Sequence, residues 1–342
     1  MIKQTRFKFI LYCLFLLPLS IFCKGNSKIE DSTQIKSYKK SADTGNVRSM
    51  YVLGVTYHWG NINGGHIDYK EAMNWYKKAA AKNHPTSMNN IGVLYERGLG
   101  VPKDYAKAMI FLQKSAKFGN NEALINIGIL YENGHGVKRS YKNAMVWYKK
   151  CADKGLSLAM NYIGVLYQNG GHGVEQNYMQ ALSWHQKAVN RGNSDSMNEI
   201  GRFYNNGWGL IKSYSKAMKW YTKSASRGNS DAQSNIAQLY QNGQGVKKDY
   251  KIALKWHNKA ADNGNAFSMY SIGWFYYNGW GVEKNDKTAR KWFKKGVVND
   301  NGQTLNKINL YIKNWMKLKN KKNKTKTLYL EVINKIKAFS GK

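Results

Sequence analysis

Three histidines recur in glycine-containing segments of this 342-residue chain, and histidine is the side chain that most often serves metal binding and proton transfer. His66, His135 and His172 occupy equivalent places in those segments. If the segments are turns between packed helices, successive ones lie at least roughly 8–10 Å apart. Zinc holds its ligands at about 2 Å. We therefore predict no metal and no cofactor. We expect His185 and His257 to be packing or rim residues, because tyrosine occupies their place in other repeats.

Other catalytic patterns do not occur in the sequence, which contains no phosphate-binding loop, HExxH, GxSxG or CxxC. Cys13 and Cys23 lie near the N-terminus, which leaves Cys151 as the single cysteine of the remaining chain. Cys151 falls in an apolar helical pattern, so we expect a small buried side chain. We predict that the protein is not an enzyme.

Lysine follows three residues after an aromatic residue at seven regularly spaced places. We expect these lysines near the C-terminal ends of helices, where positive charge suits the helix dipole. The alternative is a basic ridge along the molecule. The residues are Lys78, Lys114, Lys150, Lys187, Lys223, Lys259 and Lys295.

A tyrosine also recurs once per repeat, from Tyr57 to Tyr276, and a residue needed at every repeat is more typical of the core than of a binding site. A partner is instead expected to contact polar residues that break the period on the concave face. The candidate partner-binding residues are Asn89, Asn126, Asn161, Asn198 and Ser234.

These residues are set in a period of 36 to 38 residues, the signature of a solenoid. The landmark is a glycine inside an apolar run, replaced once by alanine: Gly54, Gly92, Gly128, Gly164, Gly201, Ala237 and Gly273. Apolar residues at spacings of three and four around it predict a first helix, "GHGV"-type segments predict a turn, and a second apolar period predicts a second helix. A further glycine, such as Gly155, ends each unit.

Glycine within a helix costs about 1 kcal/mol relative to alanine, so its recurrence indicates a close contact between helices. The residue five positions earlier is always serine or alanine, from Ser49 to Ser268. We expect the alanines of the second helix to face the glycine, with tyrosine and tryptophan filling the flanks.

The units resemble the Sel-one-like repeat (SLR) family, which is related to the tetratricopeptide repeats. Residues 230–264 carry the family pattern, "SDAQSNIAQLYQNGQGVKKDYKIALKWHNKAADNG", and Asp286 departs from it because the other units have tyrosine there. The resemblance implies an all-α, right-handed superhelical solenoid of antiparallel helix pairs, with seven SLR units over residues 35–300. It also implies an adaptor that binds other proteins, with immunity, envelope assembly and host interaction as the roles of exported bacterial members.

The N-terminus has the pattern of an export signal: Lys3, Arg6 and Lys8 precede an uncharged apolar run of 14 residues from Phe9 to Phe22. The run is short for a membrane span, which needs about 20 residues. We predict a signal peptide over residues 1–25 and a periplasmic or secreted protein. An uncleaved anchor and lipidation of Cys23 remain alternatives.

The chain carries 54 Lys and Arg against 20 Asp and Glu, a formal charge of +34. Residues 303–342 contribute 11 lysines against one glutamate, and we predict a basic capping helix and tail over residues 301–342. The leading hypothesis is an exported scaffold that holds a protein or peptide partner in the groove of the solenoid. The alternative is a binder of anionic surfaces (lipid, polysaccharide or nucleic acid) through the lysines and the basic tail.

Overall fold

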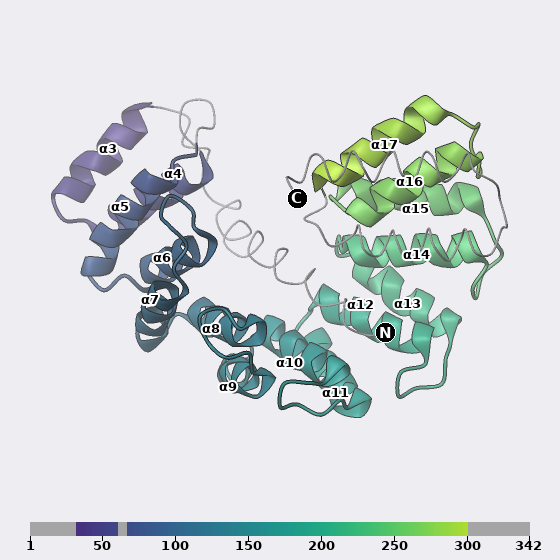
Figure 1. The fold of residues 1–342 in the computed structure, drawn as a ribbon, viewed down its shortest axis with the longest axis horizontal. Helices are drawn as coiled ribbons and strands as arrows, with labels where there is room; N and C mark the ends of the chain where they lie inside the picture. Colours follow the sequence, from purple (N-terminus) through teal and green to yellow (C-terminus); the bar gives the residue numbers. More distant parts are fainter. Residues whose placement is uncertain (1–31, 61–66, 300–342) are drawn as a thin grey trace. The chain divides into compact units, whose positions relative to one another are not determined.

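The computed structural model describes residues 32–60 and 67–299, and all regular secondary structure within these ranges is α-helical (Figure 1). A single isolated bridge, Gly171 with Val174, is the one β-type pairing there. The helices are α3 (Ser32–Asp43), α4 (Val47–Trp59), α5 (Tyr69–Ala81), α6 (Pro85–Arg97), α7 (Tyr105–Lys117), α8 (Asn121–Asn133), α9 (Tyr141–Ala152), α10 (Ser157–Asn169), α11 (Tyr178–Asn190), α12 (Ser194–Asn206), α13 (Tyr214–Ala225), α14 (Ser230–Asn242), α15 (Tyr250–Asp262), α16 (Ala266–Asn278) and α17 (Asp286–Asn299).

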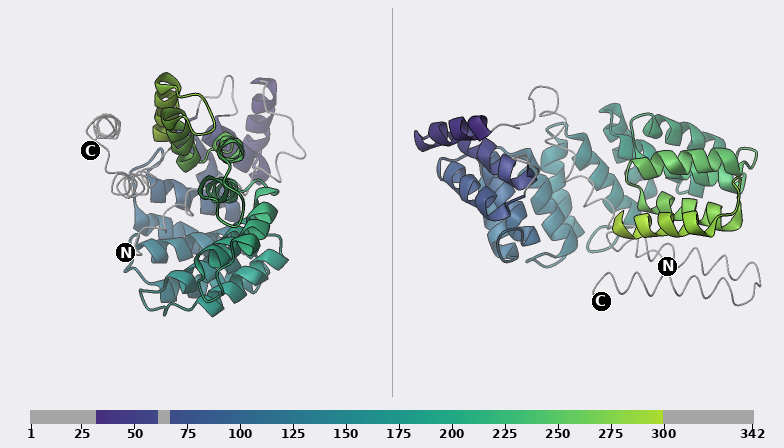
Figure 2. Two further views of the ribbon diagram at one scale, coloured as in Figure 1. Left: turned by 90° about the vertical axis from the view of Figure 1, so that its right-hand side faces the viewer. Right: turned by 90° about the horizontal axis from the view of Figure 1, so that it is seen from above.

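Helix pairs are the repeating element. The even-numbered helix from α4 to α16 is the first helix of a pair, and the odd-numbered helix after it is the second. Within each pair the two helices pack along one another, and each second helix inside a unit also packs on the next first helix, as α5 does on α6 (Figure 2). The prediction of an all-α repeat solenoid is thereby confirmed.

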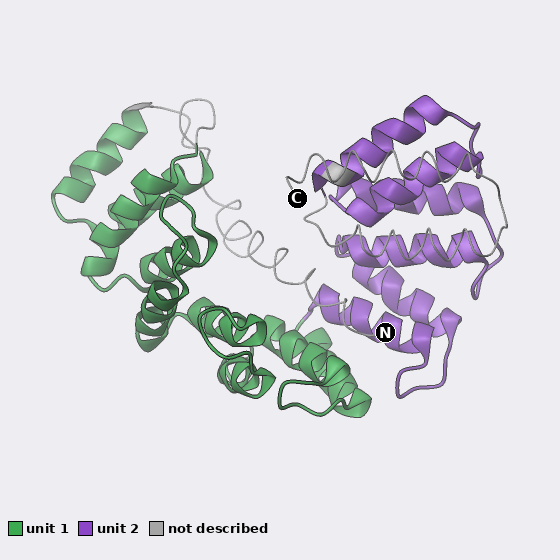
Figure 3. Cartoon of the chain, in the orientation of Figure 1, with its two compact units in different colours: residues 1–191 green, residues 192–342 purple. Residues whose placement is uncertain are grey.

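The chain divides into two compact units, one ending at Arg191 and the other beginning at Gly192 (Figure 3). Unit 1 contains α3 to α11, and α3 precedes the first pair and packs on α4. Unit 2 contains α12 to α17. In unit 1, α6 also touches α8 directly, so consecutive first helices approach one another on one side of the stack.

Local sequence explains where the helices begin and end. Asparagine precedes most first helices, as Asn120 does, and its side chain accepts a hydrogen bond from the backbone N–H of the small residue three positions on, Ala123. Asp or Ser caps most second helices in the same way. Six first helices end at a glycine with a left-handed backbone, such as Gly134 at φ 73°.

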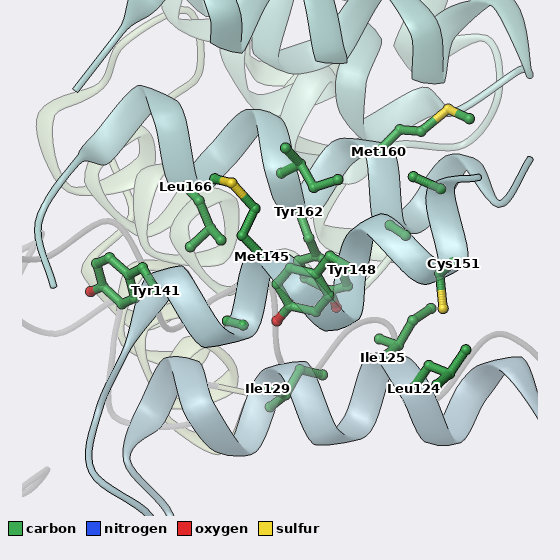
Figure 4. Close-up of a cluster of buried hydrophobic side chains, with 14 of the residues drawn as sticks. Leu124, Ile125, Ile129, Tyr141, Met145, Tyr148, Cys151, Met160, Tyr162 and Leu166 are labelled. Carbon is green, nitrogen blue, oxygen red and sulfur yellow. The ribbon is translucent and has the colours of Figure 1, made fainter. Parts of the chain in front are cut away.

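Hydrophobic packing is continuous through each unit rather than gathered at one centre. One cluster brings Tyr148 of α9 and Tyr162 of α10 together with Leu124 and Ile125 of α8 (Figure 4). Its residues therefore come from two neighbouring repeats. This is the packing expected of a solenoid, in which each pair buries its apolar face against its neighbours.

The predicted signal peptide at 1–25 and the predicted basic segment at 301–342 lie outside the described residues and stay predictions. None of the helices within residues 32–60 and 67–299 combines the length and the apolar character that a membrane span requires.

Candidate protein-interaction surface

The recurring glycine of the first helix faces an aromatic or bulky side chain of the second helix. A Cβ atom on Gly201 would lie 2.5 Å from the ring of Tyr221, and one on Gly128 would overlap the ring of Tyr148. Leu112 takes this place in the second repeat. The expectation that alanine side chains of the second helix face the glycine is therefore wrong, because a ring, or Leu112 in the second repeat, fills the space that the missing side chain leaves.

Several of these rings carry a polar group that pairs with the same first helix. The Tyr148 hydroxyl donates to Glu132 at 2.9 Å, and both side chains are buried. In the sixth repeat His257 replaces the tyrosine, with its Nε2 3.5 Å from Oε1 of Gln241. Burial lowers the pKa of His257 to about 3, so the ring is neutral. His257 is fully buried, as is His185, so of the two predicted roles, packing and rim, both residues have the packing role.

Inside each unit, the turns join each repeat to the one before it. His135, in the turn of the third repeat, stacks on Tyr105 of the second repeat with 4.6 Å between ring centroids, and Trp280 stacks on Tyr250 at 5.5 Å. The second glycine of the turn permits this approach: Gly245 has φ 70°, and a Cβ there would lie 2.5 Å from Tyr214. His172 likewise meets Tyr141, at 4.6 Å, whereas His66 lies outside the described residues.

This stacking explains the departure at Asp286. Inside each unit, the tyrosine that begins a second helix receives the turn of the following repeat, as Tyr105, Tyr141 and Tyr250 do. Within residues 32–60 and 67–299 no further repeat turn follows α17, so no turn of this kind stacks on position 286 there.

The predicted partner-binding residues are all buried, from 0% exposed at Asn161 to 5% at Asn126 and Asn198. Three of them, Asn89, Asn126 and Asn198, belong to hydrogen bonds between neighbouring first helices, which we call amide rungs. Asn126 Nδ2 donates to Asn89 Oδ1 at 2.9 Å, and Asn235 Nδ2 donates to Asn198 Oδ1 at 2.8 Å. The structure thus gives these side chains a role in stacking, and their contact with a partner stays a prediction.

More accessible positions lie on the first helix one residue after the central glycine or alanine, and we call them the variable column. In unit 1 this column is aliphatic, and in unit 2 it is polar or aromatic. The column consists of Val55, Val93, Ile129, Val165, Arg202, Gln238 and Trp274. All except Val93 and Ile129 are partly exposed. Gln238 Nε2 lies 3.4 Å from Asn235 Oδ1, so the column adjoins the amide rungs.

Unit 2 also holds a carboxylate cluster on its first helices. Asn229 Nδ2 donates to Asp195 at 2.7 Å, Asn265 Nδ2 donates to Asp231 at 2.8 Å, and Arg202 Nη1 contacts both oxygens of Glu199 at 2.8 and 2.9 Å. Burial raises the pKa of Asp195 to about 6, and the carboxylates of Asp231 and Glu199 add to the rise.

This raised pKa predicts that unit 2 loses stability as the pH rises. The folded state holds the Asp195 proton more tightly than the unfolded chain, so the stabilisation is complete below pH about 4 and disappears as the pH passes about 6. We expect Asp195→Asn to stabilise unit 2 at pH 7.5 by on the order of 1–2 kcal/mol and to flatten this dependence. Denaturant unfolding from pH 4 to 8 measures both effects. An unchanged pH profile in the variant would assign the dependence to other groups.

The seven repeated lysines each lie over the aromatic ring three residues earlier. The distance from Nζ to the ring centroid runs from 3.9 Å for Lys78 over Trp75 to 5.8 Å for Lys114 over Phe111. Such contacts contribute roughly 0.5–1 kcal/mol at exposed sites. Lys78, Lys114 and Lys150 also lie in the last turn of their helices, as predicted.

Cys151 is fully buried, as predicted, and burial raises the pKa of its thiol to about 11. Its Sγ donates to the Asn121 carbonyl at 3.3 Å. Ser115 and Ser224 make the equivalent hydrogen bond in their repeats. The thiol therefore substitutes for a serine hydroxyl between the two helices of a pair.

Sequence reasoning missed the amide rungs, the turn stacking and the lysine–ring contacts. The sequence contained a signal for two of them. Lysine three residues after an aromatic residue lies on the same helix face, which indicates the lysine–ring contact. A turn residue that is Leu, His, Gln or Trp beside invariant glycines indicates the turn stacking. No comparable signal marks the rungs, whose partners are 37 residues apart.

Stacked helix pairs with fixed packing positions and a variable accessible column define an α-helical repeat protein, a class that presents extended faces to other macromolecules. The model of the Sel1 repeat matches seven consecutive segments: 47–84, 85–120, 121–156, 157–193, 194–229, 230–265 and 266–297. The chain therefore belongs to the Sel1 repeat family, which confirms the resemblance seen in the sequence.

Solved structures of the family are similar to the chain. A Sel1 repeat protein from Oxalobacter formigenes is 31% identical with a TM-score of 0.62, over 75% of this chain and 100% of that one. A protective antigen of uropathogenic Escherichia coli that displays an SLR fold is 30% identical with a TM-score of 0.58, over 77% of this chain and 56% of the antigen.

Among curated proteins, HRD3A of Arabidopsis thaliana, a component of an ERAD-associated E3 ubiquitin-protein ligase, is 35% identical over 77 residues. The match spans 22% of this chain and 11% of HRD3A. The chain thus covers little of HRD3A and about half of the antigen, so the similarity concerns the repeats that they share.

Proposed function

We propose that the protein is an exported scaffold that binds a protein or peptide partner along the first-helix faces of its repeats. The observation that carries the proposal is the contrast between two sets of positions. The contact of the glycine with a bulky side chain and the turn stack recur in both units, whereas the variable column changes from Val165 to Arg202, Gln238 and Trp274. A face built only to stack repeats has no need of such differences, while recognition of one partner does.

Family membership supports a role in protein–protein interaction, and the N-terminal apolar run supports export to the periplasm or beyond. Similarity to the antigen of uropathogenic Escherichia coli supports host interaction as one version of the role. Immunity against a toxin and envelope assembly are the other versions that we propose.

Capture of a stoichiometric partner tests this function. We expect the chain from residue 26 to retain a discrete protein from an envelope extract or from host-cell proteins, and Val165→Asp with Gln238→Arg to lower the affinity by tenfold or more, on the order of a hot-spot loss. Both sites are partly exposed, so the new charges do not enter the core.

The matched control carries the same two charge changes on the exposed face of the second helix α11, as Ser183→Asp with Gln186→Arg. It should bind as the parent chain does. Equal loss in both variants, or equal binding by both, would place the partner elsewhere on the molecule.

A further inference from the structure

The second helices of unit 2 differ from those of unit 1 in their charge. In α13, α15 and α17 a lysine precedes the ring-bearing residue as well as following it, and all six side chains are exposed. We call these the lysine patch: Lys219, Lys223, Lys255, Lys259, Lys291 and Lys295. The position before the ring in unit 1 is uncharged, with Asn74, Ile110, Val146 and Ser183.

The lysine patch extends in two directions. Within each helix its two lysines are four residues apart and share a face, and the three helices are the consecutive second helices of one unit. An exposed lysine in the first turn adds to each helix: Lys216, Lys251 and Lys287. Between their first and last turns the three helices contain no Asp or Glu, so no acidic side chain within them neutralises the patch.

Neither a second copy of the chain nor its C-terminal segment offers an opposite net charge to the lysine patch. A second copy carries the same +34, and residues 303–342 carry 11 lysines against one glutamate. Like charges repel, so the partner must be anionic.

The chemistry of the patch favours a lipid surface over other anionic partners. The rings of Trp220, Trp256 and Trp292 are partly buried, and the Nζ atom of the lysine three residues later lies 4.5 to 5.2 Å from each ring centroid. These rings therefore offer no free surface on which nucleic-acid bases could stack. Lysine is a hydrated point charge without the planar fork by which arginine grips individual carboxylates. A two-dimensional array of such charges matches the diffuse negative potential of a bilayer that contains anionic lipids.

We propose that the lysine patch of α13, α15 and α17 docks the protein on anionic membrane surfaces through charge alone. The contact leaves the first-helix faces unused, so it adds to the proposed scaffold function and does not depend on it. It would hold the scaffold, and any bound partner, at a membrane.

Vesicle binding tests the proposal. The chain from residue 26 is used throughout, because the apolar run of residues 9–22 would bind lipid by itself. We expect binding to vesicles with about 30 mol% phosphatidylglycerol in phosphatidylcholine, and far weaker binding to phosphatidylcholine alone. Lys219→Asn, Lys255→Asn and Lys291→Asn together should weaken the binding by on the order of 100-fold at about 100 mM salt.

The matched control removes three exposed lysines from the second helices of unit 1: Lys77→Asn, Lys142→Asn and Lys149→Asn. It has the same net charge as the patch variant and should lose less than about fivefold. An equal loss in the two variants would assign binding to net charge or to other segments, and no loss in either would overturn the proposal. Loss of binding to duplex DNA without loss of vesicle binding would make the patch a nucleic-acid site instead.

Discussion

Replacing Tyr148 by alanine is expected to destabilise unit 1 by about 3–5 kcal/mol, the cost of deleting a large buried side chain that its neighbours cannot replace. Tyr148 is fully buried and stacks on Tyr162 of the next repeat at 5.0 Å (Figure 4). It also covers Gly128 and donates a hydrogen bond to Glu132. The substitution therefore removes a contact within the pair, a contact between pairs and the partner of a buried carboxylate.

The loss should be local to the neighbouring repeats, because repeats in a solenoid contact only their neighbours. Hydrogen exchange should quicken in α8, α9 and α10, whereas denaturant unfolding measures the free energy. Tyr148→Phe is the matched control: it keeps the ring and loses the hydroxyl, so we expect about 1–3 kcal/mol. A loss below about 1 kcal/mol for the alanine variant would show that the ring does not join the repeats.

Replacing Gly128 by alanine is expected to destabilise the protein, although helix propensity alone predicts stabilisation. Alanine is favoured over glycine in a helix by about 1 kcal/mol, but here its methyl group would overlap the Tyr148 ring. Overpacking of a core costs about 1–3 kcal/mol, and this contact is close enough for the upper end. We therefore expect a net destabilisation of about 2 kcal/mol in denaturant unfolding.

A double-mutant cycle separates the two contributions to this result. In the Tyr148→Ala background the space is open, so Gly128→Ala should stabilise the chain by up to about 1 kcal/mol. The same sign in both backgrounds would show that the recurring glycine serves something other than the ring contact.

The reverse change in the sixth repeat provides a control for helix preference. Ala237 is the natural alanine at this position, and its neighbouring second helix carries His257 in place of tyrosine. Ala237→Gly relieves no overlap, so it should cost about 1 kcal/mol, close to the intrinsic difference between the two residues.

Local patterns in the sequence were sufficient to predict the helix pairs, their number and the family. The spacing of the central glycine, the apolar period on each side of it and the glycine that ends each unit all act within a few residues of one another. Helix periodicity and turn chemistry depend on such neighbours, so these features can be read along the chain.

Contacts between repeats were predicted less well. Sequence reasoning identified the glycine as a site of close approach but assigned alanines to the facing position, where the structure places Tyr148 and its equivalents. It placed Asn89 and Asn126 on an accessible face, whereas both are buried in an amide rung. Both errors concern which side chains of two packed helices contact one another. That depends on how each helix is oriented about its own axis, which the sequence pattern did not determine.

By itself the sequence determined an all-α array of seven Sel1 repeats, because the residues within each repeat are sufficient to predict its helices, caps and turns. Only the tertiary structure decided that a ring, or Leu112 in the second repeat, fills the space over the recurring glycine. The same holds for the hydrogen bonds between asparagines 37 residues apart and for the raised pKa of Asp195. The physical reason is that these side chains become buried and paired only when one repeat packs on the next. The angle between packed repeats cannot be predicted from a short segment of sequence.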